Sequence, residues 1–143
     1  MRKILSLILL VLILVLSFSS CSFGKVKIDD YTWTLRTAMY IQEEELVVCA
    51  SEAPSSTHPQ ASIVEVVLTA SDGKITITDS TNQKSYEGTY KVTNKTPAGT
   101  DYEVVIDGKS GYATCAMTTY ANGNEEPTLP INLDGYSLYF YAE

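Results

Sequence analysis

The sequence predicts an all-β protein built as a single antiparallel meander of eight to nine strands. From Tyr31 on, β-branched and aromatic residues alternate with polar ones, and no long stretch has the 3.6-residue period of a helix. Turn-forming residues separate these stretches at the ~8–12-residue spacing typical of sandwiches and barrels. The short connections make neighbouring strands antiparallel, because parallel neighbours need long crossovers.

Nine segments carry the strand pattern, and a loop rich in Pro and Ser, 53–61, separates the second from the third. They are 32–41, 46–50, 62–70, 74–79, 85–93, 102–107, 111–120, 128–133 and 136–142. In the first segment, alternation puts Trp33, Leu35 and Met39 on one face, so we expect Trp33 in the core.

Asp72-Gly73 and Asp134-Gly135 each predict a two-residue type I′ hairpin turn, in which both residues have positive φ. Each turn brings apolar residues of its two strands to one face. The expected pairs are Ala70–Ile75, Leu68–Ile77, Leu133–Tyr136, Ile131–Leu138 and Leu129–Phe140. A slip of one residue would turn each apolar set to solvent, so the turns and the pattern support the same register.

The first twenty residues have the pattern of an export signal. Arg2 and Lys3 precede a 13-residue run, 4–16, that is apolar apart from Ser6. This run is shorter than the ~20 residues that span a bilayer as a helix. It leads into Ser19-Ser20-Cys21, which resembles a bacterial lipoprotein signal, in which small residues precede a lipidated Cys. The alternatives are an uncleaved anchor and cleavage next to an unmodified Cys.

The resemblance implies a signal peptide over 1–20, a lipid on Cys21 that holds the protein to a membrane, and an extracytoplasmic domain. We expect residues 21–30 to be a tether and 31–143 to form the folded domain. Without Arg2 and Lys3, eight basic and all 17 acidic residues remain, a net charge of −9. Such a chain repels nucleic acid and has no polybasic segment to attract an anionic membrane surface.

A long meander with no covering helix has two exposed edges, and closure into a barrel removes both. An early Trp33 followed by an antiparallel meander resembles small lipocalin-type barrels. We therefore expect a small lipocalin-like barrel, with a two-sheet β-sandwich as the alternative. The segment 86–92 also resembles lipoproteins of similar layout, a resemblance that implies no activity.

The sequence contains no organised catalytic or metal-binding motif. His58 lies in a loop beside Ser55 and Thr57, but nothing in the sequence orients them as a nucleophile and a base. The acidic segments 43–45 and 122–126 lack the spaced ligand ladder of a calcium loop. We expect no enzyme activity, no metal and no cofactor.

Cys49 and Cys115 both lie in predicted strands. With Cys21 assigned to lipid, they form an even pair in an exported domain, which is compatible with a disulfide. A buried free thiol behaves as a small hydrophobic side chain, and this is the alternative for each of them.

Ten Tyr residues are the strongest functional indication. Alternation places some of them on core faces, namely Tyr86, Tyr90 and Tyr136, and others outward, namely Tyr139, Tyr141, Tyr112 and Tyr120. Exposed Tyr offers rigid amphipathic contact area for sugars or protein partners. The alternative is that Tyr serves here as a strand former.

These patterns favour non-catalytic binding of a small ligand, a glycan or a protein partner. The alternative is an inhibitor of a secreted or host hydrolase that acts through the loop 53–61. A ligand binder needs a pocket in the barrel or at its mouth. An inhibitor needs a protruding loop on a filled barrel.

Overall fold

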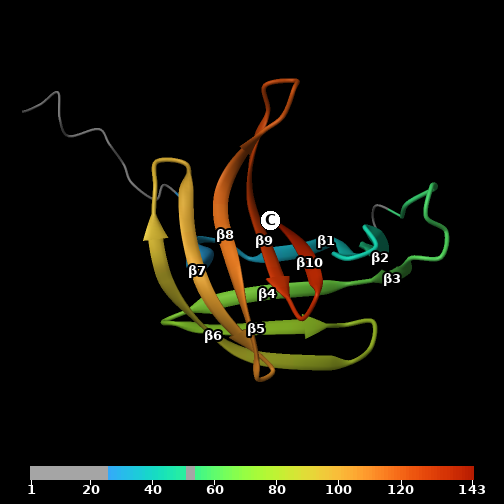
Figure 1. Ribbon diagram of the computed structural model, residues 1–143, viewed down its shortest axis with the longest axis horizontal. Coiled ribbons are helices and arrows are strands. Elements are labelled where there is room, and N and C mark those ends of the chain that lie inside the picture. Colours follow the sequence, from blue (N-terminus) through green and yellow to red (C-terminus); the bar gives the residue numbers. More distant parts are fainter. Residues whose placement is uncertain (1–25, 51–53) are drawn as a thin grey trace, which may run out of the picture.

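The computed structural model describes residues 26–50 and 54–143, so the predicted signal peptide and Cys21 lie outside the described residues. A 3₁₀ helix, η1 (Ile28–Asp30), precedes ten strands of one sheet (Figure 1). The strands are β1 (Trp33–Tyr40), β2 (Glu45–Ala50), β3 (Ser62–Val64), β4 (Val66–Ser71), β5 (Lys74–Asp79), β6 (Lys84–Lys95), β7 (Gly99–Ile106), β8 (Lys109–Thr119), β9 (Glu125–Leu133) and β10 (Tyr136–Ala142).

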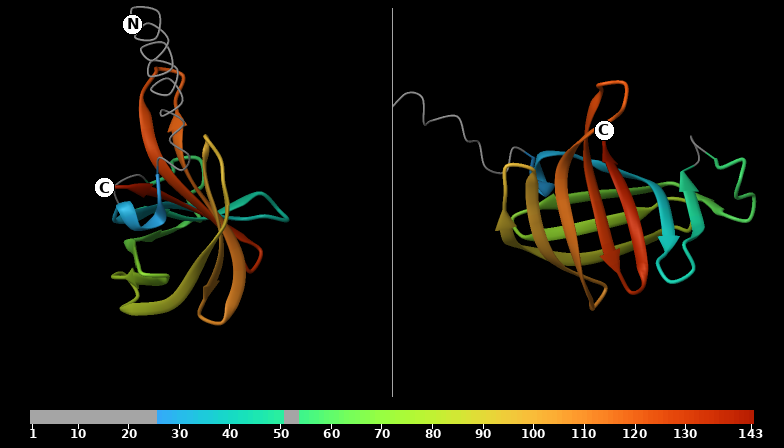
Figure 2. Two further views of the ribbon diagram at one scale, coloured as in Figure 1. Left: turned by 90° about the vertical axis from the view of Figure 1, so that its left-hand side faces the viewer. Right: turned by 45° about the horizontal axis from the view of Figure 1, so that its top comes forward.

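Eight of the strands close into an antiparallel barrel, as the sequence predicts. From β4 to β10 each strand pairs with the next, and β1 completes the ring by pairing with β10 on one side and β4 on the other. The closed ring is visible in the right-hand view of Figure 2. β2 continues the sheet from the second half of β1, and β3 pairs with β2 in parallel, so these two strands lie outside the ring.

Both predicted hairpins have the expected register and turn geometry. Leu68 pairs with Ile77 across the first turn, and Ile131 pairs with Leu138 across the second. The turn residues Asp72, Gly73, Asp134 and Gly135 all have positive φ, between 51° and 83°. A third turn of the same kind, Asp107-Gly108, joins β7 to β8 and was not predicted, although its sequence carries the same signal.

A β-bulge in β1 overturns one predicted face. The register with β10 shifts between Leu35, which pairs with Phe140, and Thr37, which pairs with Tyr139. Strict alternation put Met39 with Leu35, but the extra residue moves Ala38 to the buried face and Met39 to the other one.

The predicted strand 62–70 is also interrupted, at Glu65. The Glu65 backbone N–H donates to Thr81 Oγ1 at 2.8 Å, and its carbonyl accepts from the Ser80 N–H at 2.9 Å. Because these bonds go to the loop between β5 and β6, Glu65 separates β3, outside the ring, from β4, inside it.

One end of the barrel is closed by the segment that precedes β1. Ile28 is fully buried; its N–H donates to Tyr102 Oη at 3.2 Å, and its carbonyl accepts from Trp33 Nε1 at 2.7 Å. Val26 also belongs to the core. The tether expected over 21–30 is therefore too long, because its last residues are part of the folded domain.

The burial expected for Trp33 is confirmed, with no exposed surface. We predict that Trp33→Ala lowers the free energy of unfolding by ~3–5 kcal/mol, because it leaves a cavity and removes the partner of the Ile28 carbonyl. Denaturant unfolding measures this loss. Tyr112→Ala, at a side chain that is 63% exposed, is the control and should cost under ~0.5 kcal/mol. Equal midpoints for the two variants would contradict the prediction.

Candidate ligand pocket at the barrel mouth

The barrel contains a pocket of about 230 Å³ at the end opposite η1. Each of the eight barrel strands contributes at least one lining residue, so the pocket lies inside the ring. Its wall is mostly apolar and consists of Leu35, Val66, Ile77, Tyr86, Ile106, Leu133, Leu138 and Phe140, with Asp79, Asp107 and Lys109 as the polar members.

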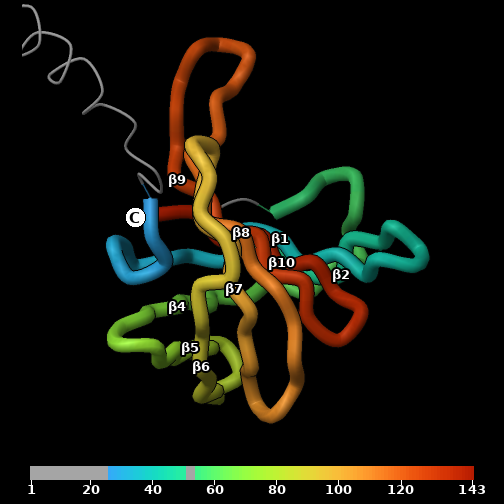
Figure 3. Tube along the Cα trace, turned by 60° about the vertical axis from the view of Figure 1, so that its left-hand side comes forward, coloured from blue at the N-terminus to red at the C-terminus, as the bar shows by residue number. Residues whose placement is uncertain are grey.

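The position of the pocket follows from the distribution of large side chains. The half of the barrel next to η1 is filled by Ile28, Trp33, Leu68 and Tyr102, all at most 2% exposed. None of these residues lines the pocket. The turns β7–β8 and β9–β10 surround the pocket end, and Figure 3 shows them pointing away from the tips of the β6–β7 and β8–β9 hairpins. The barrel therefore has one closed end and one mouth.

Asp79 is the one buried charged side chain among the described residues, and it lies at the rim of the pocket. Its Oδ1 accepts from the Asn82 backbone N–H at 2.9 Å, and its Oδ2 accepts from Asn82 Nδ2 at 2.8 Å. Burial alone would raise the pKa of Asp79. The hydrogen bonds from Asn82 and Thr81 and the charge of Lys84 outweigh that effect, so the pKa lies below its usual value and the carboxylate stays ionised.

The lysine of the pocket rim is already paired. Lys109 Nζ donates to Asp134, and this exposed pair raises the pKa of Lys109. The remaining rim carboxylate, Asp107, belongs to the β7–β8 turn and is exposed. The rim thus offers more negative than positive charge to a molecule in the mouth.

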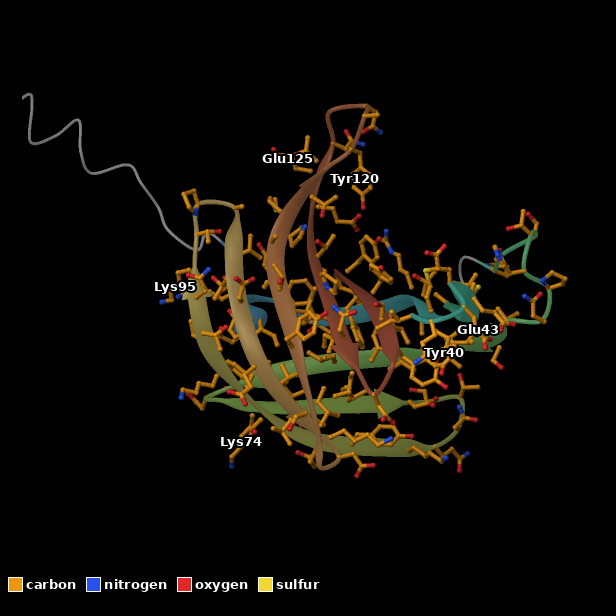
Figure 4. All side chains as sticks on the ribbon, viewed as in Figure 1. Tyr40, Glu43, Lys74, Lys95, Tyr120 and Glu125 are labelled. Atoms are coloured by element: carbon orange, nitrogen blue, oxygen red, sulfur yellow. The ribbon has the colours of Figure 1, made fainter. Side chains whose placement is uncertain are left out.

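A second, more open groove lies beneath the β8–β9 hairpin, where Tyr120 and Glu125 are labelled in Figure 4. The bulged residue Arg36 forms an ion pair with Glu126 at 2.5 Å and places its guanidinium 4.1 Å from the ring centroid of Tyr141. Tyr120 Oη donates to Glu126 at 2.9 Å, and this bond raises the pKa of Tyr120 to about 12. These four side chains form one polar and aromatic cluster.

The structure brings only two of the four predicted outward Tyr residues into this cluster. Tyr139 faces outward on β10, opposite Thr37 and Pro130, and is partly buried. Tyr112 is exposed on β8, opposite Asn132, beside the β9–β10 turn. Hence Tyr112, Tyr120, Tyr139 and Tyr141 do not make a single binding surface.

The Tyr residues assigned to the core divide in the same way. Tyr86 and Tyr90 are partly buried and pack against the core. Tyr136 is 39% exposed and was assigned wrongly. It directly follows the turn and packs against Tyr40 outside the core, with ring centroids 5.3 Å apart and the ring planes inclined at 52°. The fully buried Tyr is Tyr102, which the sequence pattern did not single out.

The loop His has local partners only. His58 Nδ1 lies 3.2 Å from Ser55 Oγ and 2.9 Å from Thr57 Oγ1, within the loop between β2 and β3. No described residue from another element joins this group through a hydrogen bond. These contacts join neighbouring residues of one loop.

The acidic segments 43–45 and 122–126 each combine turn residues with the start of the next strand. Glu43, Glu44 and Glu45 are exposed, and Asn122 accepts a hydrogen bond from the Asn124 N–H. The structure groups no three His, Cys, Asp or Glu side chains as metal ligands within residues 26–50 and 54–143. In the same described part of the chain, no helix is long and apolar enough to cross a membrane.

Cys49 and Cys115 are both buried free thiols and do not form a disulfide, so the sequence alternative of a buried free thiol applies to each of them. Cys49 lies on β2, outside the ring, whereas Cys115 faces the core from β8. Burial raises the pKa of the Cys115 thiol to about 12, so it stays protonated and unreactive at neutral pH.

Comparisons of the chain with protein-family models, with curated proteins and with solved structures found no match.

We predict that neither Cys49 nor Cys115 of a Cys21→Ala protein reacts with a thiol reagent in the native state. After unfolding without a reductant, both should react, because they are free and protected only by burial. Counting reactive thiols before and after unfolding measures this. An unfolded, unreduced protein with no reactive thiol would contain the disulfide instead.

Proposed function

We propose that this protein is a lipid-anchored extracytoplasmic binding protein that takes a small, mainly apolar ligand into the mouth of its barrel. The observation that carries the proposal is the pocket of about 230 Å³, walled by side chains from every barrel strand. It favours a ligand binder over the hydrolase inhibitor, which needs a filled barrel below a protruding loop. The proposed role is non-catalytic.

The size of the pocket limits the ligand. Typical pockets for drug-sized molecules measure ~300–1,000 Å³, whereas a cavity of ~150 Å³ with Leu, Ile and Phe walls accepts benzene. A volume of about 230 Å³ suits a single ring or a short alkyl chain.

The rim determines the preferred polar group of the ligand. The carboxylate of Asp79 is ionised and that of Asp107 is exposed, whereas Lys109 is held by Asp134. A ligand ammonium in the mouth would be attracted to these carboxylates, and a ligand carboxylate would be repelled. We therefore favour a small apolar amine.

Hexylammonium, hexanol and heptanoate carry the same hexyl chain and test this proposal. We predict the strongest binding for hexylammonium and the weakest for heptanoate, measured by NMR titration, with shifts at Leu35, Ile77 and Leu133. Leu138→Trp should weaken binding about tenfold, a loss of ~1.4 kcal/mol, because the larger side chain fills the pocket.

Tyr139→Trp is the matched control, because it adds bulk to the same strand on the outer face and should leave binding unchanged. Asp79→Asn should reduce the preference for the amine over the alcohol. Shifts confined to the outer surface, or equal binding by Leu138→Trp, would contradict the pocket as the site.

The proposed anchor is supported by the signal-like segment and by Ser19-Ser20-Cys21. We predict that Cys21→Ala moves the protein from the membrane fraction to the soluble fraction and abolishes labelling by a fatty acid, without changing its thermal unfolding. Fractionation and metabolic labelling measure these effects. A Cys21→Ala protein that stays in the membrane fraction would exclude lipid as the anchor.

The groove beneath the β8–β9 hairpin supports a second candidate, a glycan or protein partner. Tyr120 lines the groove and is held by Glu126, and Tyr141 lies against Arg36 next to it, which lowers the entropy cost of contact. We predict that Tyr120→Ser with Tyr141→Ser reduces retention on cell-wall glycan, whereas Tyr112→Ser, at an exposed site elsewhere, does not. Equal retention of all three proteins would remove this candidate.

A further inference from the structure

We infer that the η1 end of the barrel faces the membrane and that the mouth of the ligand pocket faces away from it. This inference rests on the proposed lipid at Cys21. It adds that the pocket exchanges its ligand with the aqueous phase and does not take it directly from the bilayer.

The first argument is the length of the tether. Cys21 and Val26 are five residues apart in the sequence. A fully extended chain of this length spans at most ~18 Å. Val26 is 4% exposed, and Ile28 is fixed by its hydrogen bonds to Tyr102 and Trp33. The folded domain therefore begins almost at the lipid, and the point of attachment is the closed end of the barrel.

The second argument is the distance from this attachment to the mouth. β1 leads from η1 to the mouth and contains eight residues, Trp33–Tyr40, which span ~23 Å at ~3.3 Å per residue. Because barrel strands tilt by about 35–45° to the axis, β1 rises about 18 Å along it, so an upright barrel with its mouth on the bilayer would need a fully extended tether. The β8–β9 hairpin extends beyond the η1 end (Figure 2).

Fluorescent labels at the two ends test the orientation in the full lipidated protein on vesicles that carry a nitroxide quencher on their headgroups. Ala98→Cys places a label on the exposed β6–β7 turn at the η1 end, and Ser80→Cys places one on the exposed β5–β6 loop at the mouth. Cys49 and Cys115 are buried and do not compete for the label. We expect the loss of fluorescence at Ala98 to be several-fold greater than at Ser80.

Vesicles without the quencher are the control for each label, and Trp33 emission confirms that both variants are folded. Twenty Gly and Ser residues inserted between Gly24 and Lys25 add ~25 Å of root-mean-square reach and should remove the difference between the labels. Retained protein with equal quenching, or with stronger quenching at Ser80, overturns the orientation and leaves the anchor intact. Protein that is not retained overturns the anchor and, with it, the orientation.

Discussion

The architecture depends on the closure of one barrel end by Ile28. Its N–H and carbonyl are bonded to Tyr102 and Trp33, so a backbone that would otherwise be buried without partners is satisfied by two core side chains. The two aromatic groups fill the adjoining half of the barrel, and the other half is lined by a mostly apolar wall that leaves a pocket. An eight-stranded barrel is wide enough to be filled by side chains or to hold one small ligand. Here the large side chains occupy the η1 end, so the pocket lies at the mouth.

The bulge at Arg36 is the second constraint, and it acts on both surfaces of β1. Inside, it moves Ala38 into the core opposite Leu138, so a small side chain lies next to the pocket wall. Outside, it directs Arg36 onto Tyr141 and Glu126. Along the strand, β1 pairs with β4 before the bulge and with β2 after it. One extra residue therefore shapes the mouth, the outer cluster and the departure of β2 from the ring.

What the sequence predicted correctly was local and repetitive. Each Asp-Gly turn fixes the register of two strands, and the alternation then assigns their faces, which is why Leu68, Ile77, Ile131 and Leu138 were placed correctly. The errors have non-local causes. Met39 was assigned to the wrong face because the bulge lies in the pairing of β1 with β10, which is far away in the sequence. The core role of Val26 and Ile28 was missed because it depends on Tyr102, which lies 74 residues after Ile28. The pocket could not be predicted either, because it depends on how eight strands share one interior.

Asp79, at the rim of the pocket, has a structural role and, in the proposed function, a role in recognising the ligand. A buried carboxylate is costly unless it is hydrogen-bonded, and here Asn82 satisfies one acceptor position on each oxygen and at the same time shapes the β5–β6 loop. A carboxylate offers about four acceptor positions, so the bonds from Asn82 and Thr81 leave room for a further donor. The charge is therefore fixed before any ligand arrives, and a bound ammonium would not have to order it. An arrangement of this kind attracts a cation at little conformational cost, while the apolar wall behind it accepts the rest of the molecule.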